Sequence, residues 1–181
     1  MKVKNTKIEG LILLEPEVHG DKRGFFMESY HEDKYHKAGI REKFVQDNRS
    51  KSRKNVLRGL HYQKEKPQGK LVSVLDGKIF DVAVDLRLDS KTFGMWESFI
   101  LSSSNNYQLY IPPGFAHGFC VLSEQADFIY KCTEFYSPQD ECGLVWNDKT
   151  LNIKWPVDDP IISEKDALLP SFLGKEIIIN E

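Results

Sequence analysis

Short alternating segments, separated by turn-forming residues, constrain the fold of this chain more than any other sequence feature. The run Lys70–Leu75 is followed by Asp76 and Gly77, and then by the run Lys78–Arg87, KIFDVAVDLR. An Asp-Gly pair between two strand-like runs is typical of a two-residue β-hairpin, because both central residues of that turn need positive φ. The pattern therefore predicts that these two runs pair as a hairpin.

The second of these runs is amphipathic at the two-residue period of a β-strand. One face carries only apolar side chains and the other mixes apolar and acidic ones: Phe80, Val82, Val84 and Leu86 share the first, and Ile79, Asp81, Ala83 and Asp85 share the second. This alternation predicts a strand in a sheet that has a dry side and a wetter side.

The other strand-like segments are short and are separated by clusters of Gly, Pro, Asn and Ser. They are Trp96–Leu101, Gln108–Ile111, His117–Leu122, Asp127–Phe135 and Gly143–Trp146. Helical signals are scarce: Glu32–Ala38 is closed by Gly39, and Ser163 is placed to cap a short helix with Asp166 three residues on. The pattern predicts a mostly β fold, an antiparallel jelly-roll barrel with short peripheral helices. A length of 181 residues fits a single domain, 1–181.

Bulk charge and hydropathy argue against several classes of protein. A net charge of -2 does not suit a protein that binds the phosphate backbone of nucleic acid. No apolar run approaches the roughly 20 residues of a membrane span, and Met1–Lys7 lacks the apolar core of a signal peptide. The three cysteines include no close C-x-x-C pair, which is typical of reduced thiols. We expect a cytoplasmic protein that binds neither nucleic acid nor membrane.

The segment Leu57–Gln63, LRGLHYQ, places His61 in a run that is otherwise typical of a buried strand. Metal-binding jelly rolls combine a His-x-His pair, a nearby Glu and a later His after a Pro-x-Gly turn. Here Pro112–His117 provides the later element, but Gln63 stands where the second histidine is needed, and Lys66–Gln68 and Lys70 stand near the acidic position. Two histidines beside a lysine and without an acid are a poor site for a transition metal. The sequence predicts that no metal is bound.

The remaining residue types suit proton transfer without a metal. His61 can act as a general base near neutral pH, and Lys70 can stabilise an enolate oxygen. Tyr130 can return a proton, and Asp166 can orient a histidine and stabilise its charged form. Each residue also has a purely structural interpretation, since a strand histidine, a core tyrosine or a helix-start aspartate needs no catalytic role.

Five motifs in order along the chain resemble those of one enzyme family. They are GDKRGFFMESY (Gly20–Tyr30), VQDNRSKSRKNVLRGLHYQ (Val45–Gln63), GKLVSVLDGKIFDVAVDLR (Gly69–Arg87), IPPGFAHGF (Ile111–Phe119) and ISEKD (Ile162–Asp166). From about Leu13 to about Pro170 the sequence resembles the dTDP-4-dehydrorhamnose 3,5-epimerases, cupin-like jelly-roll isomerases of rhamnose biosynthesis.

The resemblance implies a cofactor-free reaction on a nucleotide sugar. The implied substrate is dTDP-4-dehydro-6-deoxy-D-glucose, and the product is dTDP-4-dehydro-L-rhamnose. His61 would be the base and Asp166 its partner, Lys70 would stabilise the enolate at the C4 oxygen, and Tyr130 would reprotonate from the opposite face. The family is typically dimeric, so we expect a homodimer.

The resemblance also assigns substrate-binding positions. They are Arg23, Phe25, Glu28, Gln46, Asp47, Asn48, Arg58, Lys70, His117, Tyr136 and Glu141. Arg23 and Arg58 suit a diphosphate, because guanidinium groups match phosphate oxygens. Tyr136 would stack on the thymine ring, and Phe25 would form an apolar wall.

Two geometric questions stay open in the sequence. Arg58 and His61 are three residues apart and would face opposite sides of a regular strand, so either Gly59 marks a bulge or Arg58 reaches the neighbouring subunit's site. His117 could be oriented by either Asp81 or Asp85 and would then support the sugar without being the base.

Three other functions compete with the double epimerase. They are an epimerase that inverts a single carbon in another deoxysugar pathway, a non-catalytic sugar-binding jelly roll and a metal-dependent cupin. The binder does not need a His–Asp pair together with a lysine and a tyrosine, so it explains fewer of the residues.

Overall fold

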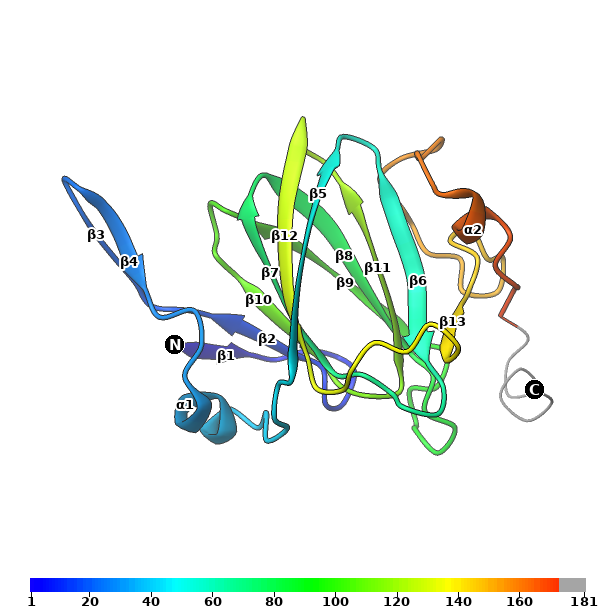
Figure 1. The fold of residues 1–181 in the computed structure, drawn as a ribbon, viewed down its shortest axis with the longest axis horizontal. Coiled ribbons are helices and arrows are strands. Elements are labelled where there is room, and N and C mark those ends of the chain that lie inside the picture. The colour runs from blue at the N-terminus through cyan, green and yellow to red at the C-terminus, as the bar shows by residue number, and fades with distance from the viewer. Residues whose placement is uncertain (173–181) are drawn as a thin grey trace.

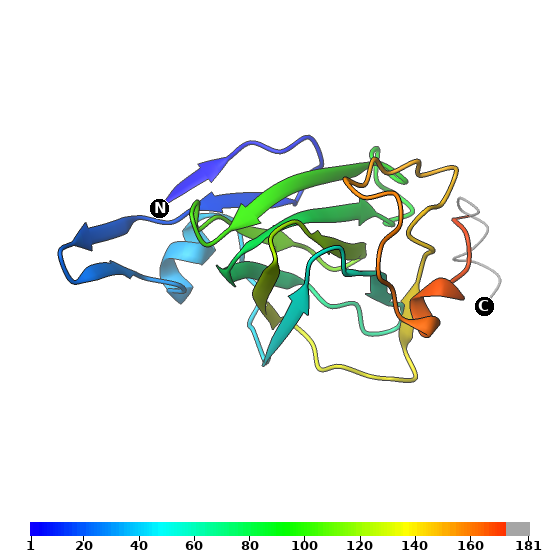
Figure 2. The same ribbon diagram turned by 90° about the horizontal axis from the view of Figure 1, so that it is seen from above.

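Two antiparallel sheets face each other in the computed structural model, which describes residues 1–172 (Figures 1 and 2). The six-stranded sheet has the order β1 (Lys2–Lys4), β2 (Ile12–Glu15), β10 (Gln108–Ile111), β7 (Lys70–Asp76), β12 (Gln125–Cys132) and β5 (Gln46–Arg53). The five-stranded sheet has the order β13 (Glu141–Gly143), β6 (Leu57–Gln63), β11 (Phe115–Val121), β8 (Lys78–Asp85) and β9 (Trp96–Ser102). This arrangement confirms the predicted antiparallel jelly roll. The predicted domain also includes residues 173–181, which lie outside the described residues.

The two predicted helices are present and short. Helix α1 spans Glu32–Lys37, and α2 spans Glu164–Ala167. As predicted, Ser163 caps α2, since its hydroxyl oxygen accepts a hydrogen bond of 3.0 Å from the backbone N–H of Asp166. This cap fixes the start of the helix that carries Asp166.

Most predicted strands match the structure to within a few residues. Strand β10 has the predicted bounds, and β9, β11 and β12 overlap their predicted segments closely. The prediction of a strand at Gly143–Trp146 is wrong in its bounds, because β13 spans Glu141–Gly143, although Leu144 still exchanges backbone hydrogen bonds with Leu60. The polar strand β5 was not predicted. It lies at the edge of its sheet and has no apolar residues, so its sequence lacks the apolar–polar alternation that indicates a strand.

The predicted hairpin at Asp76-Gly77 is wrong. Strand β7 pairs with β10 and β12, whereas β8 pairs with β9 and β11, so the turn carries the chain from one sheet to the other. Gly77 does adopt a positive φ of 83°. A Cβ atom there would lie 2.1 Å from the backbone oxygen of Gln125. Glycine is therefore needed because the chain passes close to the backbone of β12 where it crosses between the sheets.

The prediction of a dry and a wetter face on β8 is also wrong, because both faces are buried. Ile79 and Ala83 belong to the core between the sheets, whereas Val82 and Val84 pack on the outside against Leu144 and other residues of the C-terminal segment. The acidic residues of this strand therefore lie inside the protein and need partners there.

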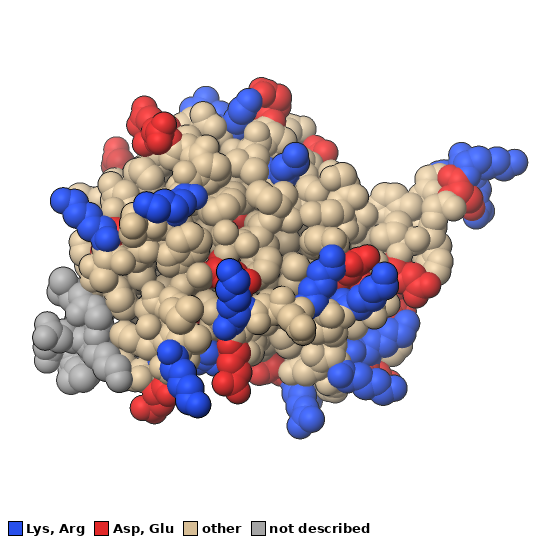
Figure 3. All heavy atoms as spheres, turned by 180° about the vertical axis from the view of Figure 1, so that it is seen from behind, with Lys and Arg blue, Asp and Glu red and all other residues tan. Residues whose placement is uncertain are grey.

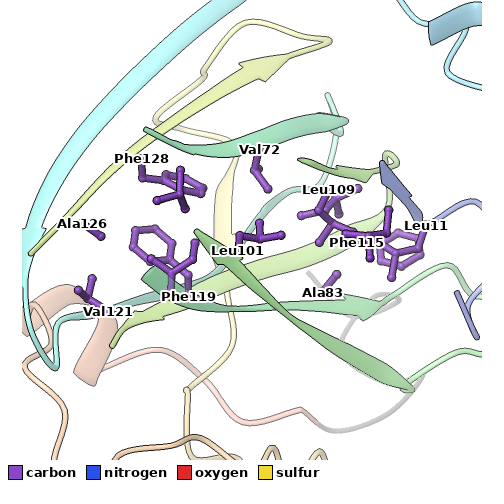
Figure 4. Packing of buried hydrophobic residues seen from close by; sticks show 14 of the residues in the cluster. Leu11, Val72, Ala83, Leu101, Leu109, Phe115, Phe119, Val121, Ala126 and Phe128 are labelled. Carbon is purple, nitrogen blue, oxygen red and sulfur yellow. The ribbon is translucent and has the colours of Figure 1, made fainter. Parts of the chain in front are cut away.

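The main core fills the space between the two sheets. Figure 4 shows aromatic and aliphatic side chains from both sheets interdigitating in this layer. The rings of Phe119, from β11, and Phe128, from β12, have centroids 4.5 Å apart and join the two sheets at one end. These two rings also line the cavity described below, together with its polar residues.

A β-bulge interrupts β6 in the middle of LRGLHYQ. His61 pairs with His117 and Arg58 pairs with Phe119, so Gly59 and Leu60 together oppose the single residue Gly118. Gly59 has a φ of 110°, and a Cβ atom on it would lie 2.6 Å from the Cα atom of Gly118. The Gly59–Leu60 peptide bond is cis. The extra residue turns Arg58 toward the same side as His61, which answers the first geometric question in favour of the bulge.

A two-stranded arm projects from the body of the protein. It consists of β3 (Val18–Asp21) and β4 (Gly24–Met27), and both ribbon views show it extending away from the sheets (Figures 1 and 2). Phe25 and Phe26 on this arm are 63% and 71% exposed. Such a hairpin is marginally stable alone in water, so its apolar residues point to a further packing partner.

Charged side chains of both signs are scattered over the face in Figure 3, with no continuous basic stripe on that face. None of the helices within residues 1–172 is long and apolar enough to cross a membrane.

Candidate active site

A cavity of about 420 Å³ opens between the two sheets. The five-stranded sheet contributes His61 from β6 and His117 from β11, and the six-stranded sheet contributes Lys70 from β7 and Tyr130 from β12. Lys70 and Tyr130 project from neighbouring strands, so a bound ring would have these two residues on one side and His61 on the other. Arg58 also lines this cavity.

His61 is paired with Asp166 across 105 residues of sequence. Its Nε2 atom lies 2.9 Å from Asp166 Oδ1, while Asp166 Oδ2 accepts a hydrogen bond of 3.2 Å from the backbone N–H of Gly59. Burial acts to raise the pKa of Asp166, but the hydrogen bond with His61 and the one from Gly59 outweigh it, so the pKa is lowered. The carboxylate therefore stays charged behind the imidazole.

His117 is paired with Asp81, which answers the second geometric question. Its Nε2 atom lies 2.9 Å and 3.1 Å from the two carboxylate oxygens of Asp81. Asp85 instead accepts hydrogen bonds from Arg87, Ser90 and Thr92. The His117 ring also stacks on Phe128, with centroids 6.1 Å apart. The two histidines thus lie on the neighbouring strands β6 and β11, and each is paired with its own aspartate.

Burial shifts the two titratable groups of the opposite sheet in ways that suit their chemistry. It lowers the pKa of Lys70, while Cys132 and the nearby carboxylates of Asp81 and Glu141 act to raise it. Burial raises the pKa of the Tyr130 phenol, which keeps that proton in place at neutral pH. The cavity therefore sets an amine and a protonated phenol against a histidine–carboxylate pair.

A second cavity of about 310 Å³ shares His61, Lys70 and Tyr130 with the first. Its other walls include Gln46, Asn48, Tyr136 and Glu141. The Tyr136 hydroxyl donates a hydrogen bond of 2.8 Å to Glu141 Oε2, which also accepts from Lys165 Nζ. Burial acts to raise the pKa of Glu141, but the bonds from Lys165 and Tyr136 outweigh it and lower the pKa. The second cavity therefore combines an exposed aromatic ring with polar groups.

The donor set does not favour a metal ion. Among the described residues, no group of three or more His, Cys, Asp or Glu side chains is gathered closely enough to hold one. Each histidine at the cavity is already engaged by its own carboxylate, and Lys70 adds a positive charge to the same space.

Comparisons with known proteins agree over nearly the whole chain. The family model described as dTDP-4-dehydrorhamnose 3,5-epimerase matches residues 5–173. The dTDP-4-dehydrorhamnose 3,5-epimerase of Shigella flexneri is 52% identical over 181 residues, which cover 99% of this chain and all of that one. This chain belongs to the dTDP-4-dehydrorhamnose 3,5-epimerase family.

Two solved structures of this family carry informative ligands. An epimerase from Legionella pneumophila, in complex with dTDP-4-keto-L-rhamnose, is 52% identical, with a TM-score of 0.91 and coverage of 94% of this chain and 92% of that one. The epimerase from Bacillus anthracis, with TDP and PPi bound, is 49% identical, with a TM-score of 0.92 and coverage of 94% and 98%. Family members thus bind a nucleotide sugar, a nucleotide or diphosphate on this same fold.

Most residues that the sequence predicted for an epimerase site line one of the two cavities, but Asp47 does not. It alternates with Gln46 and Asn48 along β5, so its side chain faces away from them. Its carboxylate instead pairs with Lys131 Nζ at 3.0 Å.

Three more predicted residues line neither of these two cavities. Arg23, Phe25 and Glu28 belong to the projecting arm or its base. Arg23 is paired with Asp21, and Glu28 with Lys34. Within one chain of this epimerase-family protein, the structure therefore does not bring them to His61.

Sequence reasoning missed Lys165, which lines neither cavity but contacts Glu141 of the second one. It precedes Asp166 in α2, and its ammonium reaches Glu141 on β13. The one available signal was that Lys165 is a basic residue next to Asp166, the predicted partner of His61.

Proposed function

We propose that this isomerase inverts C3 and C5 of dTDP-4-dehydro-6-deoxy-D-glucose and yields dTDP-4-dehydro-L-rhamnose. The observation that carries the proposal is the placement of His61 and Tyr130 on opposite sheets around one cavity. A base and an acid on opposite sides of a sugar ring are what inversion at a carbon requires.

The chemistry begins with the 4-keto group, which acidifies the hydrogens on C3 and C5. The His61 imidazole takes one of these protons, and Asp166 stabilises the resulting imidazolium. The electron pair of the broken C–H bond moves into an enolate, whose oxygen is stabilised by the ammonium of Lys70.

Inversion follows when the carbon is reprotonated from the other face. Tyr130 donates its phenolic proton to the enolate carbon, and the carbonyl re-forms. The phenolate is reprotonated by solvent, and His61 releases its proton to solvent, so no net proton is gained or lost. The same cycle at the second carbon completes the isomerisation, with no electron transfer and no cofactor.

Binding roles follow from the positions around the two cavities. Arg58 is an exposed residue that lines the first cavity, and its guanidinium suits diphosphate oxygens. His117, held by Asp81, supports the sugar. Tyr136 stacks on the thymine ring in the second cavity, where Gln46, Asn48 and Glu141 supply polar contacts.

The projecting arm supports a homodimer in which each subunit completes its partner's site. Phe25 and Met27 line a hollow with Leu71 and Ile129 on the outer face of the six-stranded sheet, so an apolar surface extends from the arm onto the body. In such a dimer, the arm brings Arg23, Phe25 and Glu28 to the substrate of the other subunit. Asp47 pairs with Lys131 in this chain, so its predicted contact with the substrate stays a prediction.

Mixing two inactive variants tests this arrangement. Arg23→Glu disables the arm, and His61→Ala disables the base. In a heterodimer, the site that keeps His61 receives the intact arm of its partner, so refolded mixtures should regain about a quarter of the wild-type activity. If the mixtures stay inactive although sedimentation shows dimers, the shared site is wrong.

Deuterium wash-in tests the reaction itself. Wild-type protein in D2O should place deuterium at C3 and C5 of the 4-keto nucleotide sugar, with both centres inverted by NMR. Tyr130→Phe should still wash deuterium into the substrate but yield little inverted product, because proton removal does not need the phenol. Folded wild-type protein that exchanges neither hydrogen would indicate a sugar-binding protein instead, and inversion at one carbon only would indicate a monoepimerase.

We also propose that the chain acts as a single domain in the cytoplasm. One core between two sheets supports the first statement. The buried thiols of Cys120 and Cys132, which are free, suit a reducing compartment.

A further inference from the structure

The side chain of Gln63 is buried and fully engaged, although it stands where a metal-binding jelly roll has a histidine. It is 5% exposed. Its amide nitrogen donates to the backbone oxygens of Lys66, at 2.8 Å, and Phe135, at 3.2 Å. Its amide oxygen accepts from the backbone N–H of Ser137, at 2.9 Å. Gln63 thus joins two loops: 64–69, which follows β6, and 133–140, which follows β12.

Asp140 joins the same two loops from the opposite direction. Its carboxylate oxygens accept hydrogen bonds from the backbone N–H groups of Lys64, Glu65 and Lys66, at 3.1, 2.8 and 2.8 Å. Three successive peptide groups that converge on one carboxylate form a fixed anion nest. Burial acts to raise the pKa of Asp140, but these N–H groups outweigh it and lower the pKa.

Further bonds continue this junction toward Lys70. The side-chain amide of Gln68 donates to the backbone oxygen of Glu134 at 2.8 Å, and the Gly69 N–H donates to Thr133 Oγ1 at 2.7 Å. The two loops are therefore connected along most of their length. They carry Tyr136 on one side and lead directly into Lys70 on the other.

Tyr136 depends on this junction for its place. Its ring is exposed at the second cavity, and its backbone N–H donates to Gln46 Oε1 at 2.9 Å. The peptide groups on either side of it, at Phe135 and Ser137, are the two that Gln63 holds in the 133–140 loop. An aromatic ring fixed on both flanks loses little further freedom when it stacks on a base.

We propose that Gln63 and Asp140 are positioning residues that preorganise Tyr136 for the nucleobase of the substrate. This proposal rests on the proposed function, in which Tyr136 stacks on that base. Gln63 lies two residues after His61 on the same strand and pairs with Glu141 across to β13. Strand β6 thus carries both the proposed base, His61, and Gln63, which positions Tyr136 for the nucleobase.

A positioning role makes a specific kinetic prediction. The two loops border the second cavity, whereas Asp166 and His117 lie at the first. Loosening the loops should therefore raise KM and the dissociation constant of dTDP while kcat changes little.

Gln63→Glu in the full-length protein is the sharpest variant. It keeps the size of the side chain and the acceptor for Ser137, but it turns a carboxylate oxygen toward the two carbonyl groups. We expect dTDP, measured by calorimetry, to bind about tenfold more weakly or worse, since buried acceptors lose their donor. Binding of pyrophosphate, which has no base, should stay unchanged. Gln125→Glu, an exposed glutamine on β12 that touches neither loop, is the matched control and should bind dTDP normally.

A double-mutant cycle with Tyr136→Ala distinguishes positioning from general damage. If Gln63 acts through Tyr136, Gln63→Glu should add no loss of dTDP affinity once Tyr136 is alanine. A full additional loss, an equal loss of pyrophosphate binding, or an unchanged dTDP affinity in Gln63→Glu would each overturn the proposal. If Tyr136→Ala itself leaves dTDP affinity unchanged, the stacking role in the proposed function is what fails. If Gln63→Glu does not fold, Asp140→Asn is carried through the same measurements, and the same outcomes decide.

Discussion

Two histidine–carboxylate pairs lie next to each other at this site, and they differ mainly in access to solvent. Both have a closest nitrogen–oxygen distance of 2.9 Å. The side chains of His61 and Asp166 are 28% and 6% exposed, whereas those of His117 and Asp81 are 7% and 0% exposed. The closest distance is thus the same, although Asp81 faces His117 with both oxygens and Asp166 faces His61 with one. Only His61 can readily exchange a proton with solvent after each turnover.

The origins of the two carboxylates differ as well. Asp81 lies on β8, directly beside β11, so its pair is built into the sheet. Asp166 lies on the short helix α2, which reaches β6 from outside the barrel on the side opposite the arm (Figure 1). We therefore propose that access and attachment, and not the pairing itself, separate the proposed catalytic base His61 from the proposed supporting group His117.

Removing each imidazole should give the largest contrast. His61→Ala should lower kcat by about 10³-fold or more, because general base catalysis is lost. His117→Ala should lower it by only about tenfold, because a contact to the sugar is lost but the base remains. Rates of C3 and C5 hydrogen exchange in D2O measure both effects. The reverse ranking would show that His117 is the base.

Replacing each carboxylate by its amide should give a smaller contrast. Asp166→Asn should lower kcat by about 10²-fold, since the imidazolium of His61 loses its counter-charge. Asp81→Asn should leave most of kcat at neutral pH. Steady-state kinetics on both variants, with melting temperatures as a control for folding, checks this order. An Asp81→Asn enzyme as slow as Asp166→Asn would contradict it.

The pH dependence of activity should also distinguish the two histidine–carboxylate pairs, because Asp81 of the His117 pair affects the pKa of Lys70. Burial lowers the pKa of Lys70 and the charge of Asp81 opposes that shift, so activity should fall on the alkaline side as Lys70 loses its proton. Asp81→Asn removes one of the charges that oppose this shift and should move the alkaline limb to lower pH. Lys70→Arg should move it to higher pH, even if the rate is reduced, because arginine stays charged. A limb that moves in neither variant would belong to another group.

The smallest expected effect concerns the cap of α2. Ser163→Ala removes the hydroxyl that accepts from the Asp166 N–H and should cost about 1 kcal/mol of local stability. Since α2 holds Asp166, kcat should fall a few-fold while the binding of dTDP stays unchanged. Ser123→Ala, at a turn far from the cavities, serves as a control. A change in dTDP binding with unchanged kcat would show that α2 does not act through His61.

Local patterns predicted the elements of this fold better than their pairing. The Gly77 signal correctly indicated a positive φ, but a sharp turn can join strands of the same sheet or of facing sheets, and only packing decides between them. The acidic residues of β8 suggested a wet face for the same reason, since periodicity cannot register an internal partner such as His117.

The candidate site depended on long-range contacts that spacing does not encode. The chemical types at His61, Lys70 and Tyr130 were readable, but the 105-residue separation of His61 from Asp166 was not. The pairing came from resemblance. The arm residues show a second limit of sequence reasoning. Their motif is complete in the sequence, yet within one chain they do not line the cavity.

The bulge in β6 also has an evolutionary consequence. A Cβ atom on Gly59 would lie 2.6 Å from the Cα atom of Gly118, and one on Gly118 would lie 2.7 Å from the backbone oxygen of Arg58. A side chain at either glycine would clash with the backbone of the facing strand, so neither position can change independently of the other. Among descendants of this sequence, drift should therefore spare both glycines together, and a library randomised at the two codons should return active clones only with the original pair.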